Sequence, residues 1–170
     1  MAAHPSTIRL LALDVDGVLT DGSILIDDTG RETKRFNIRD GFGLRLWARL
    51  GFHTAIITGR SGPALHHRAA ELKISEIVQG CTDKGAALES LASRTGLALR
   101  EMAFLGDDWP DISALSRVGY PMAVADAAPE ILALAAYITR RPGGRGAVRE
   151  AIEHLIGAHG LMERARALYD

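Results

Sequence analysis

Short apolar runs recur along the chain and are separated by longer stretches of mixed polarity. Each run is too short for a helix, and several end at glycine or aspartate, which is typical of strands buried in a sheet. The runs predict strands at residues 8–13, 53–58, 74–79, 102–106, 122–125 and 137–139.

The stretches between these runs carry apolar residues three or four positions apart, which is the period of an amphipathic helix. Pro63 near the start of one stretch, and Gly96 and Gly157 after two others, suit helix boundaries. Helices are expected at residues 42–50, 61–72, around 88–92, 110–118 and 147–156. Strands that alternate with such helices indicate βαβ units. We therefore predict an α/β fold, with a mainly parallel, Rossmann-like sheet covered by helices on both faces in three layers.

One segment departs from this alternation directly after the first strand. Residues 23–27 and 31–38 both resemble strands, and a glycine turn lies between them. We therefore predict a β-hairpin at about residues 22–38. Residues 1–157 are expected to form a single domain, while residues 158–170 fit either a short helix or a loose tail.

Composition places the chain among ordinary globular proteins and narrows its partners. Hydrophobic residues make up 47% of the chain and charged residues 24%, which suits one domain with a sizeable core. The net charge of −1 lacks the positive field that nucleic acids require, so no nucleic-acid partner is expected. Cys81 is the only cysteine, which excludes an internal disulfide and suits a reducing compartment. The sequence has no signal-peptide pattern and no apolar stretch of about 18 residues, so we expect a cytoplasmic protein without a membrane partner.

The first candidate for chemistry is the pair Asp14 and Asp16 at the end of the first predicted strand. Residues two apart at a strand end point to the same side, so the two carboxylates share one space. Ligands bind at the carboxyl ends of strands in such sheets. Two close carboxylates repel unless a cation lies between them, which favours a hard divalent metal together with a nucleophile and an acid/base. A solvated acidic turn is the alternative interpretation of this motif alone.

Two further candidates are polar residues that follow later elements. Thr58 and Gly59 end the second long strand, where a hydroxyl and nearby N–H groups can approach a phosphoryl oxygen. Lys84 begins a helix, where a cation does not complement the helix dipole unless both face an anion. Each signal is weak by itself, since Thr-Gly commonly ends a strand and exposed lysines are common.

The last candidate is an acidic cluster after the strand at residues 102–106. Asp107, Asp108 and Asp111 lie within five residues, and Asp108 followed by Pro110 also suits a helix cap. The cap does not explain all three aspartates. Because the acid pair, the threonine, the lysine and the acid cluster belong to successive βα units, we expect them to meet at one edge of the sheet.

These residues resemble the four motifs of the haloacid dehalogenase superfamily, which are DxDGxxT, a Ser or Thr after the second strand, a Lys, and GDDxxD. The matching residues are Asp14 and Asp16, Thr58, Lys84, and Asp107, Asp108 and Asp111. Further strings resemble the 3-deoxy-D-manno-octulosonate 8-phosphate (KDO 8-phosphate) phosphatases of that superfamily. They are FNIRDGFG (36–43), ITGR (57–60), QGCTDKG (79–85), VADA (124–127) and GGRGAVRE (143–150).

The resemblance implies a Mg²⁺-dependent phosphatase of lipopolysaccharide precursor synthesis. It implies that Asp14 attacks phosphorus and that Asp16 serves as acid and then as base. Mg²⁺ would be bound by the Asp14 carboxylate, the Asp16 main-chain carbonyl and the Asp107 carboxylate. Asp108 or Asp111 would hold its waters. Thr58 and Lys84 would stabilise the charge on the transferred phosphoryl group, where most of the catalytic effect in such reactions arises.

The resemblance also predicts which substrate the chain acts on. Relatives that act on a nine-carbon keto acid tend to have Glu after the Thr-Gly, whereas this chain has Arg60, which suits the eight-carbon substrate. Gly59, Arg60, Arg68 and Arg145 are the expected substrate-binding residues. For Arg68 a surface charge, and for residues 143–146 a flexible helix entry, stay open as alternatives.

The expected order of elements leaves no room for a cap domain. Only the hairpin and one helix are predicted between Asp16 and Thr58, and one helix between Lys84 and Asp107. The resemblance implies a homotetramer in which hairpins pack together and a neighbouring subunit covers the open site.

Three other functions are alternatives to that of a KDO 8-phosphate phosphatase. A phosphatase for a nine-carbon sugar acid 9-phosphate would share the reaction. A non-catalytic interaction subunit is disfavoured because Asp14, Asp16, Lys84 and Asp107 are all in place. A receiver-type signalling domain carries its phosphorylated aspartate after the third strand, whereas here the acidic pairs follow other strands.

Overall fold

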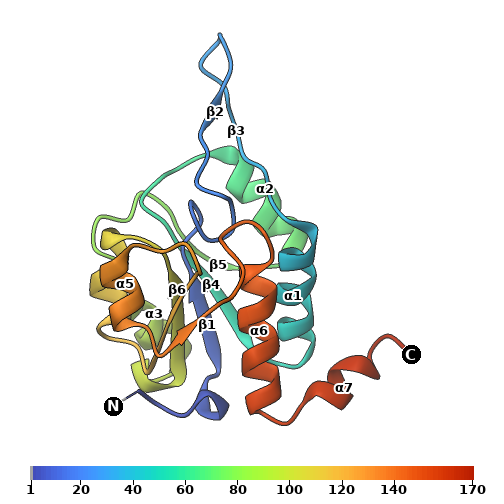
Figure 1. Cartoon of the computed structure of the whole chain (residues 1–170). Coiled ribbons are helices and arrows are strands. Elements are labelled where there is room, and N and C mark those ends of the chain that lie inside the picture. The colour runs from blue at the N-terminus through green and yellow to red at the C-terminus, as the bar shows by residue number, and fades with distance from the viewer. Residues whose placement is uncertain (1) are drawn as a thin grey trace.

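The computed structural model describes residues 2–170, which fold into one six-stranded sheet with helices on both faces and a small hairpin (Figure 1). The strands of the main sheet are β1 (Leu10–Leu13), β4 (His53–Ile57), β5 (Glu76–Val78), β6 (Met102–Gly106), β7 (Tyr120–Ala123) and β8 (Tyr137–Ile138). Their order is β5-β4-β1-β6-β7-β8, and every pairing is parallel. The predicted α/β class with a Rossmann-like parallel sheet is confirmed.

The helices form the two outer layers. They are α1 (Ile38–Arg49), α2 (Pro63–Leu72), α3 (Lys84–Thr95), α4 (Ile112–Leu115), α5 (Pro129–Leu134), α6 (Ala147–Ala158) and α7 (Met162–Arg166), with 3₁₀ turns at Pro5–Thr7, Leu99–Glu101 and Trp109–Asp111. Figure 1 shows α1 and α6 side by side on one side of the sheet, with α3 and α5 on the other. None of the helices in the described part of the chain is long and apolar enough to cross a membrane.

The core lies between the central strands and these helices. All four residues of β1 are fully buried, because β1 has parallel neighbours on both edges and helices on both faces. Trp47 of α1 is also fully buried, and its Nε1 donates a hydrogen bond to the carbonyl of His53 at 2.8 Å. Its ring stacks on Phe52 with centroids 3.9 Å apart, so the end of α1 is fixed against the start of β4.

The hairpin is smaller than the sequence predicted. It consists of β2 (Leu25–Ile26) and β3 (Glu32–Thr33), and the strand predicted at 31–38 ends early because its last residue, Ile38, begins α1. Asn37 caps that helix by accepting a hydrogen bond from the N–H of Arg39, so α1 starts four residues before the predicted position. Within residues 2–170 no additional domain separates β1 from β4 or α3 from β6.

Other boundaries differ where polar or proline residues override the apolar pattern. The helix predicted at 110–118 is a 3₁₀ turn followed by the single turn of α4. The strand predicted at 122–125 starts two residues earlier, at Tyr120, and includes Pro121. The short helix α5, which begins at Pro129, was not predicted. The segment after residue 157, for which a helix and a tail were both open, contains the short helix α7.

Candidate active site

Three neighbouring strands end at the same edge of the sheet, and each delivers a polar residue there. In the parallel register Leu13 of β1 pairs with Ile56 of β4 and with Leu105 of β6. Asp14 therefore leaves β1 beside the ends of β4 and β6, which lead to Thr58 and to Asp107. The carboxyl edge of the sheet thus collects residues that are far apart in the sequence, as the strand-end argument predicts.

Lys84 joins this group from the first position of α3. Its side chain is 3% exposed, and Nζ lies 2.9 Å from Asp14 Oδ1 and donates a hydrogen bond to Asp111 Oδ1 at 2.6 Å. Burial alone would lower the pKa of Lys84, but the carboxylates of Asp14 and Asp111 raise it above its usual value. The lysine therefore stays a cation at the centre of an acidic cluster.

The carboxylates around Lys84 form a site that suits a divalent cation. Oxygens of Asp14, Asp107 and Asp111 all lie within 4.8 Å of one another. Burial, followed by the neighbouring Asp111 carboxylate, raises the pKa of Asp14 to about 6. Burial, followed by the charges of Asp14 and Asp111, raises the pKa of Asp107 to about 8. These shifts report carboxylates that are buried and lie close to one another.

Unpaired oxygens support the same conclusion. Asp14 Oδ1 and Asp107 Oδ1 are buried and make no hydrogen bond to any residue between 2 and 170. Lys84 forms an ion pair with the Asp14 oxygen, while its hydrogen bond goes to Asp111. Buried oxygens of this kind are the ligands that Mg²⁺ prefers, so the donor set fits the metal.

Gly17 is required for this arrangement because the backbone passes directly beside Asp107. Its φ of +88° is disfavoured for other residues, and a Cβ at this position would overlap the Asp107 carboxylate. The glycine of the DxDG motif therefore brings the loop after β1 into contact with the loop after β6.

Asp111 and Asp108 organise the loop after β6. Asp111 is 1% exposed and, besides binding Lys84, accepts a hydrogen bond from the N–H of Asp107 at 2.9 Å. Asp108 accepts one from the N–H of Trp109 at 2.8 Å and caps the 3₁₀ turn. The Trp109 side chain is 61% exposed. Asp111 thus belongs to the carboxylate cluster itself, while the expected role of Asp108 in holding waters stays a prediction.

Asp16 lies in a second charged cluster that involves the hairpin. Lys34, whose side chain is 6% exposed, forms an ion pair with Asp16 Oδ1 and lies 3.0 Å from Glu32 Oε1. Arg60 donates a hydrogen bond to Glu32 Oε2 at 2.7 Å, and its Nε is 3.8 Å from Asp16 Oδ2. Sequence reasoning missed Lys34 and Glu32. Their spacing of two residues within a predicted strand was the only signal that they share a face.

The turn after β4 holds Thr58 and Gly59. Thr58 is 2% exposed, and its Oγ1 accepts a hydrogen bond from the N–H of Arg60 at 3.3 Å. Its carbonyl accepts one from the N–H of Cys81 at 3.0 Å, which ties this turn to the loop before α3. A Cβ at Gly59 would make only an ordinary contact at 3.6 Å, so this glycine is not required by packing within the subunit.

Two of the predicted substrate-binding residues, Arg145 and Arg68, lie in different parts of the structure. Arg145 is largely exposed, and its Nη2 lies 3.7 Å from Asp21 Oδ2, close to the loop that follows Asp14. Arg68 donates hydrogen bonds to Glu71 at 2.7 Å and to the carbonyl of Asn37 at 3.3 Å. The structure therefore brings Arg145 toward the loop after β1 but holds Arg68 against the start of α1.

The glycine loop at 143–146 packs on the loop after β1, which contains Gly17. A Cβ at Gly143 would overlap the carbonyl of Gly17, so only glycine permits this approach of the two backbones. Asp40 of α1, which is 1% exposed, accepts hydrogen bonds from the N–H groups of Gly146 at 3.2 Å and Arg149 at 2.8 Å. It caps α6 from another helix, and burial raises its pKa. Sequence reasoning missed this role because the partners are distant in the chain.

Known proteins resemble the chain closely. A family model described as haloacid dehalogenase-like hydrolase matches residues 69–152. The 3-deoxy-D-manno-octulosonate 8-phosphate phosphatase of Escherichia coli K12 is 43% identical over 164 residues, which cover 96% of this chain and 87% of the relative.

Solved structures of relatives superpose along nearly the whole chain. The phosphatase of this description from Moraxella catarrhalis, in complex with magnesium ion, phosphate ion and KDO, is 40% identical with a TM-score of 0.95, covering 98% of this chain and 96% of that one. The Yersinia pestis enzyme is 42% identical with a TM-score of 0.92, covering 94% and 86%.

Proposed function

Because this chain belongs to the 3-deoxy-D-manno-octulosonate 8-phosphate phosphatase family of the haloacid dehalogenase-like hydrolases, we propose that it hydrolyses KDO 8-phosphate to KDO and phosphate through an aspartyl phosphate on Asp14. The observation that carries the proposal is the cluster of Asp14, Asp107 and Asp111 around buried Lys84 at the carboxyl edge of the sheet. Such a cluster fits a metal and an anionic substrate together.

In the first half of the reaction, an oxygen of Asp14 attacks phosphorus and the bond from phosphorus to the sugar oxygen breaks. Asp16 donates a proton to the departing oxygen, so the sugar leaves as an alcohol. Lys84 and the hydroxyl of Thr58 stabilise the charge on the phosphoryl oxygens. Mg²⁺, which Asp14, Asp107 and the carbonyl of Asp16 would hold, supplies positive charge that offsets the repulsion between these carboxylates and the phosphate when it is bound.

In the second half, Asp16 accepts a proton from water, and the water oxygen attacks the phosphorus of the aspartyl phosphate. The bond to Asp14 breaks, phosphate is released, and the carboxylate is restored. The ion pair with Lys34 and the neighbouring Arg60 hold the Asp16 side chain in one orientation during both proton transfers.

The decisive experiment is phosphate release from KDO 8-phosphate with and without Mg²⁺, in the native protein and in Asp14→Asn. Turnover that requires Mg²⁺ and is lost in Asp14→Asn is the expected result. The matched control is Asp28→Asn at the exposed hairpin turn, which makes the same chemical change and should leave turnover intact. A folded native protein that binds Mg²⁺ but releases no phosphate would contradict an enzymatic role and favour a non-catalytic subunit.

The substrate is tested with a panel of phosphorylated eight-carbon and nine-carbon keto acids and hexose phosphates. We expect the highest kcat/KM for the eight-carbon acid, and a loss in Arg60→Glu that the nine-carbon acid does not share. Preference for hexose phosphates would overturn the substrate assignment while leaving the reaction class in place.

The assembly belongs to the same proposal, in which a cytoplasmic homotetramer forms by packing of hairpins. Ile24, Leu25 and Ile26 of the hairpin are each more than half exposed, and apolar exposure of this kind is typical of interaction surfaces. Sedimentation velocity of the native protein tests the state, and a monomer at micromolar concentration would contradict it.

A further inference from the structure

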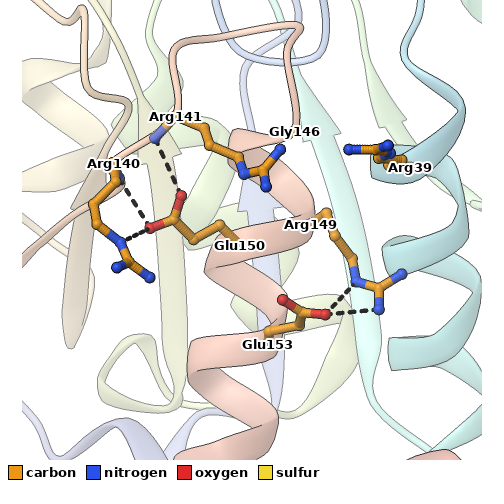
Figure 2. A pocket seen from close by; sticks show the side chains of 7 residues that line it. All are labelled: Arg39, Arg140, Arg141, Gly146, Arg149, Glu150 and Glu153. Atoms are coloured by element: carbon orange, nitrogen blue, oxygen red, sulfur yellow. Dashed lines mark hydrogen bonds and ion pairs between the residues drawn. The ribbon is translucent and has the colours of Figure 1, made fainter.

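A groove with a volume of about 700 Å³ opens beside the first turns of α6 and is lined in part by Gly146 of the glycine loop. Figure 2 shows its lining, which comes from the start of α1, from the segment after β8 and from α6. Four arginines and two glutamates line it, and none of the proposed catalytic residues does. Because the whole chain has a net charge of −1, this concentration of arginine is a feature of the groove and not of the chain as a whole.

The two glutamates are occupied by two of the arginines and by backbone groups. Glu150 accepts hydrogen bonds from the N–H groups of Arg140 and Arg141 at 2.9 and 3.1 Å, and from Arg140 Nε at 3.3 Å. Glu153 accepts one from Arg149 Nε at 2.8 Å and lies 2.6 Å from its Nη2 (Figure 2). Each glutamate is therefore already paired with an arginine of the groove.

Arg39 and Arg141 remain without such partners. Within residues 2–170 neither guanidinium forms an ion pair, and both side chains are exposed. Figure 2 shows them on opposite sides of the first turn of α6. The buried carboxylate of Asp40 offsets part of this charge, but its oxygens already accept the N–H groups of Gly146 and Arg149.

We propose that this arginine groove binds a small phosphate-bearing molecule at a site separate from the catalytic carboxylates. A guanidinium presents two parallel N–H groups that match the oxygens of a phosphate, so two free guanidiniums facing one cavity favour such a ligand. The groove has the volume of a small-molecule site, which is about 300–1,000 Å³. Arg149 also lines the groove, but its charge is offset by its ion pair with Glu153.

The test is calorimetric titration of metal-free protein in EDTA, with inorganic phosphate in one arm and pyrophosphate in the other. The titration is done at about pH 9, above the raised pKa values of Asp14 and Asp107, where the carboxylates of Asp14, Asp107 and Asp111 outnumber Lys84 and repel anions, so the catalytic centre contributes little. We expect saturable binding at one site in at least one arm. Binding of phosphate identifies the reaction product as a ligand, whereas binding of pyrophosphate alone identifies a diphosphate-bearing molecule.

Variants locate the bound anion. Arg39→Gln and Arg141→Gln should each weaken binding about tenfold, the effect of one hydrogen bond to a charged group, and together they should abolish it. The control is Arg45→Gln, which removes an exposed arginine from the same helix outside the groove and should bind normally. No binding in either arm, unchanged binding in the double variant, or equal weakening in Arg45→Gln would overturn the proposal. Loss of binding in Arg60→Gln would place the anion at the catalytic centre and would also overturn it.

Discussion

The carboxyl edge of the sheet and the hairpin that follows β1 are in contact through Lys34 and Asp16, but they are built differently. At the edge, Lys84 and Asp111 are nearly fully buried, and each makes at least two polar contacts with other groups of the site. The hairpin pairs only two residues on each strand and exposes more than half of Ile24, Leu25 and Ile26.

The two regions therefore differ in how firmly their side chains are held: the edge is fixed, whereas the hairpin can adapt its shape. A buried ion pair has few alternative positions, so the edge holds reacting groups at fixed distances. A hairpin supported by two residue pairs is free to adapt to another surface. The link between the two regions is Lys34, which lies at the base of the hairpin and contacts Asp16 at the edge.

The strongest test of the comparison is Lys84→Gln, which leaves the buried carboxylates of Asp14 and Asp111 without their cation. Removing one partner of a buried ion pair costs about 3–5 kcal/mol of unfolding free energy. Urea unfolding of the metal-free protein measures this loss. The matched change Lys73→Gln, at an exposed position, should cost little. Equal stability of both variants would mean that the edge is no more constrained than the surface.

Magnesium should stabilise the edge in a pH-dependent way. In the metal-free protein the pKa of Asp14 is raised to about 6 and that of Asp107 to about 8. A carboxyl whose folded pKa is raised favours folding while protonated, and this contribution is lost as pH rises from about 4 through those values.

We therefore expect the rise in Tm on adding Mg²⁺ to be larger at pH 8 than at pH 5. At a concentration about 100 times its Kd, the metal would add about 2.7 kcal/mol. Thermal melts at both pH values with and without EDTA check this. A larger rise at pH 5 would contradict the assignment of the raised carboxyls to the metal site.

The link between the regions is tested by Lys34→Met. Loss of its ion pair with Asp16 should lower kcat about 10–100-fold, the range of one acid/base group held out of position, while KM changes little. Lys34→Arg should restore part of kcat, and Arg31→Met, which removes another hairpin cation, serves as the control. A rise in KM with normal kcat would instead assign Lys34 to substrate binding.

The smallest effect is expected in the hairpin itself. Leu25→Ser replaces a side chain that is 51% exposed, so the unfolding free energy of the dissociated subunit should change by less than about 0.5 kcal/mol. The same variant should weaken the proposed assembly, which sedimentation velocity detects. A large loss of subunit stability would show that the hairpin belongs to the core. It would then not differ from the carboxyl edge of the sheet as described above.

Sequence reasoning predicted best where short apolar runs end in polar residues. Asp14, Thr58 and Asp107 were expected at one edge because parallel strands align their ends, and this placement needs no knowledge of side-chain contacts. Their individual roles stay predictions. Asp108 or Asp111 was expected to hold waters of the metal, and this role stays a prediction for both; Asp111 lies within the carboxylate cluster, where a 3₁₀ turn after β6 brings it to Lys84.

What the sequence could not supply were contacts between distant segments. Lys34 lies in a segment of charged residues, and nothing local distinguishes it from Arg31 or Arg35. In the sequence, Asp40 is indistinguishable from an ordinary aspartate in the first turn of a helix. In the structure, its carboxylate caps α6. Contacts of this kind depend on how whole helices and strands pack together. The apolar pattern predicts that packing only approximately.

The backbone contact between Gly143 and Gly17 has a consequence for how the molecule matures during synthesis. The loop that carries Asp14, the proposed nucleophile, is translated first, whereas the segment that packs against it is translated only after all the strands and helices between them. A ribosome-bound chain that stops before residue 143 would hold every reacting residue and still lack this support. Enzymatic competence should therefore arise late and abruptly, once the closing segment has left the exit tunnel.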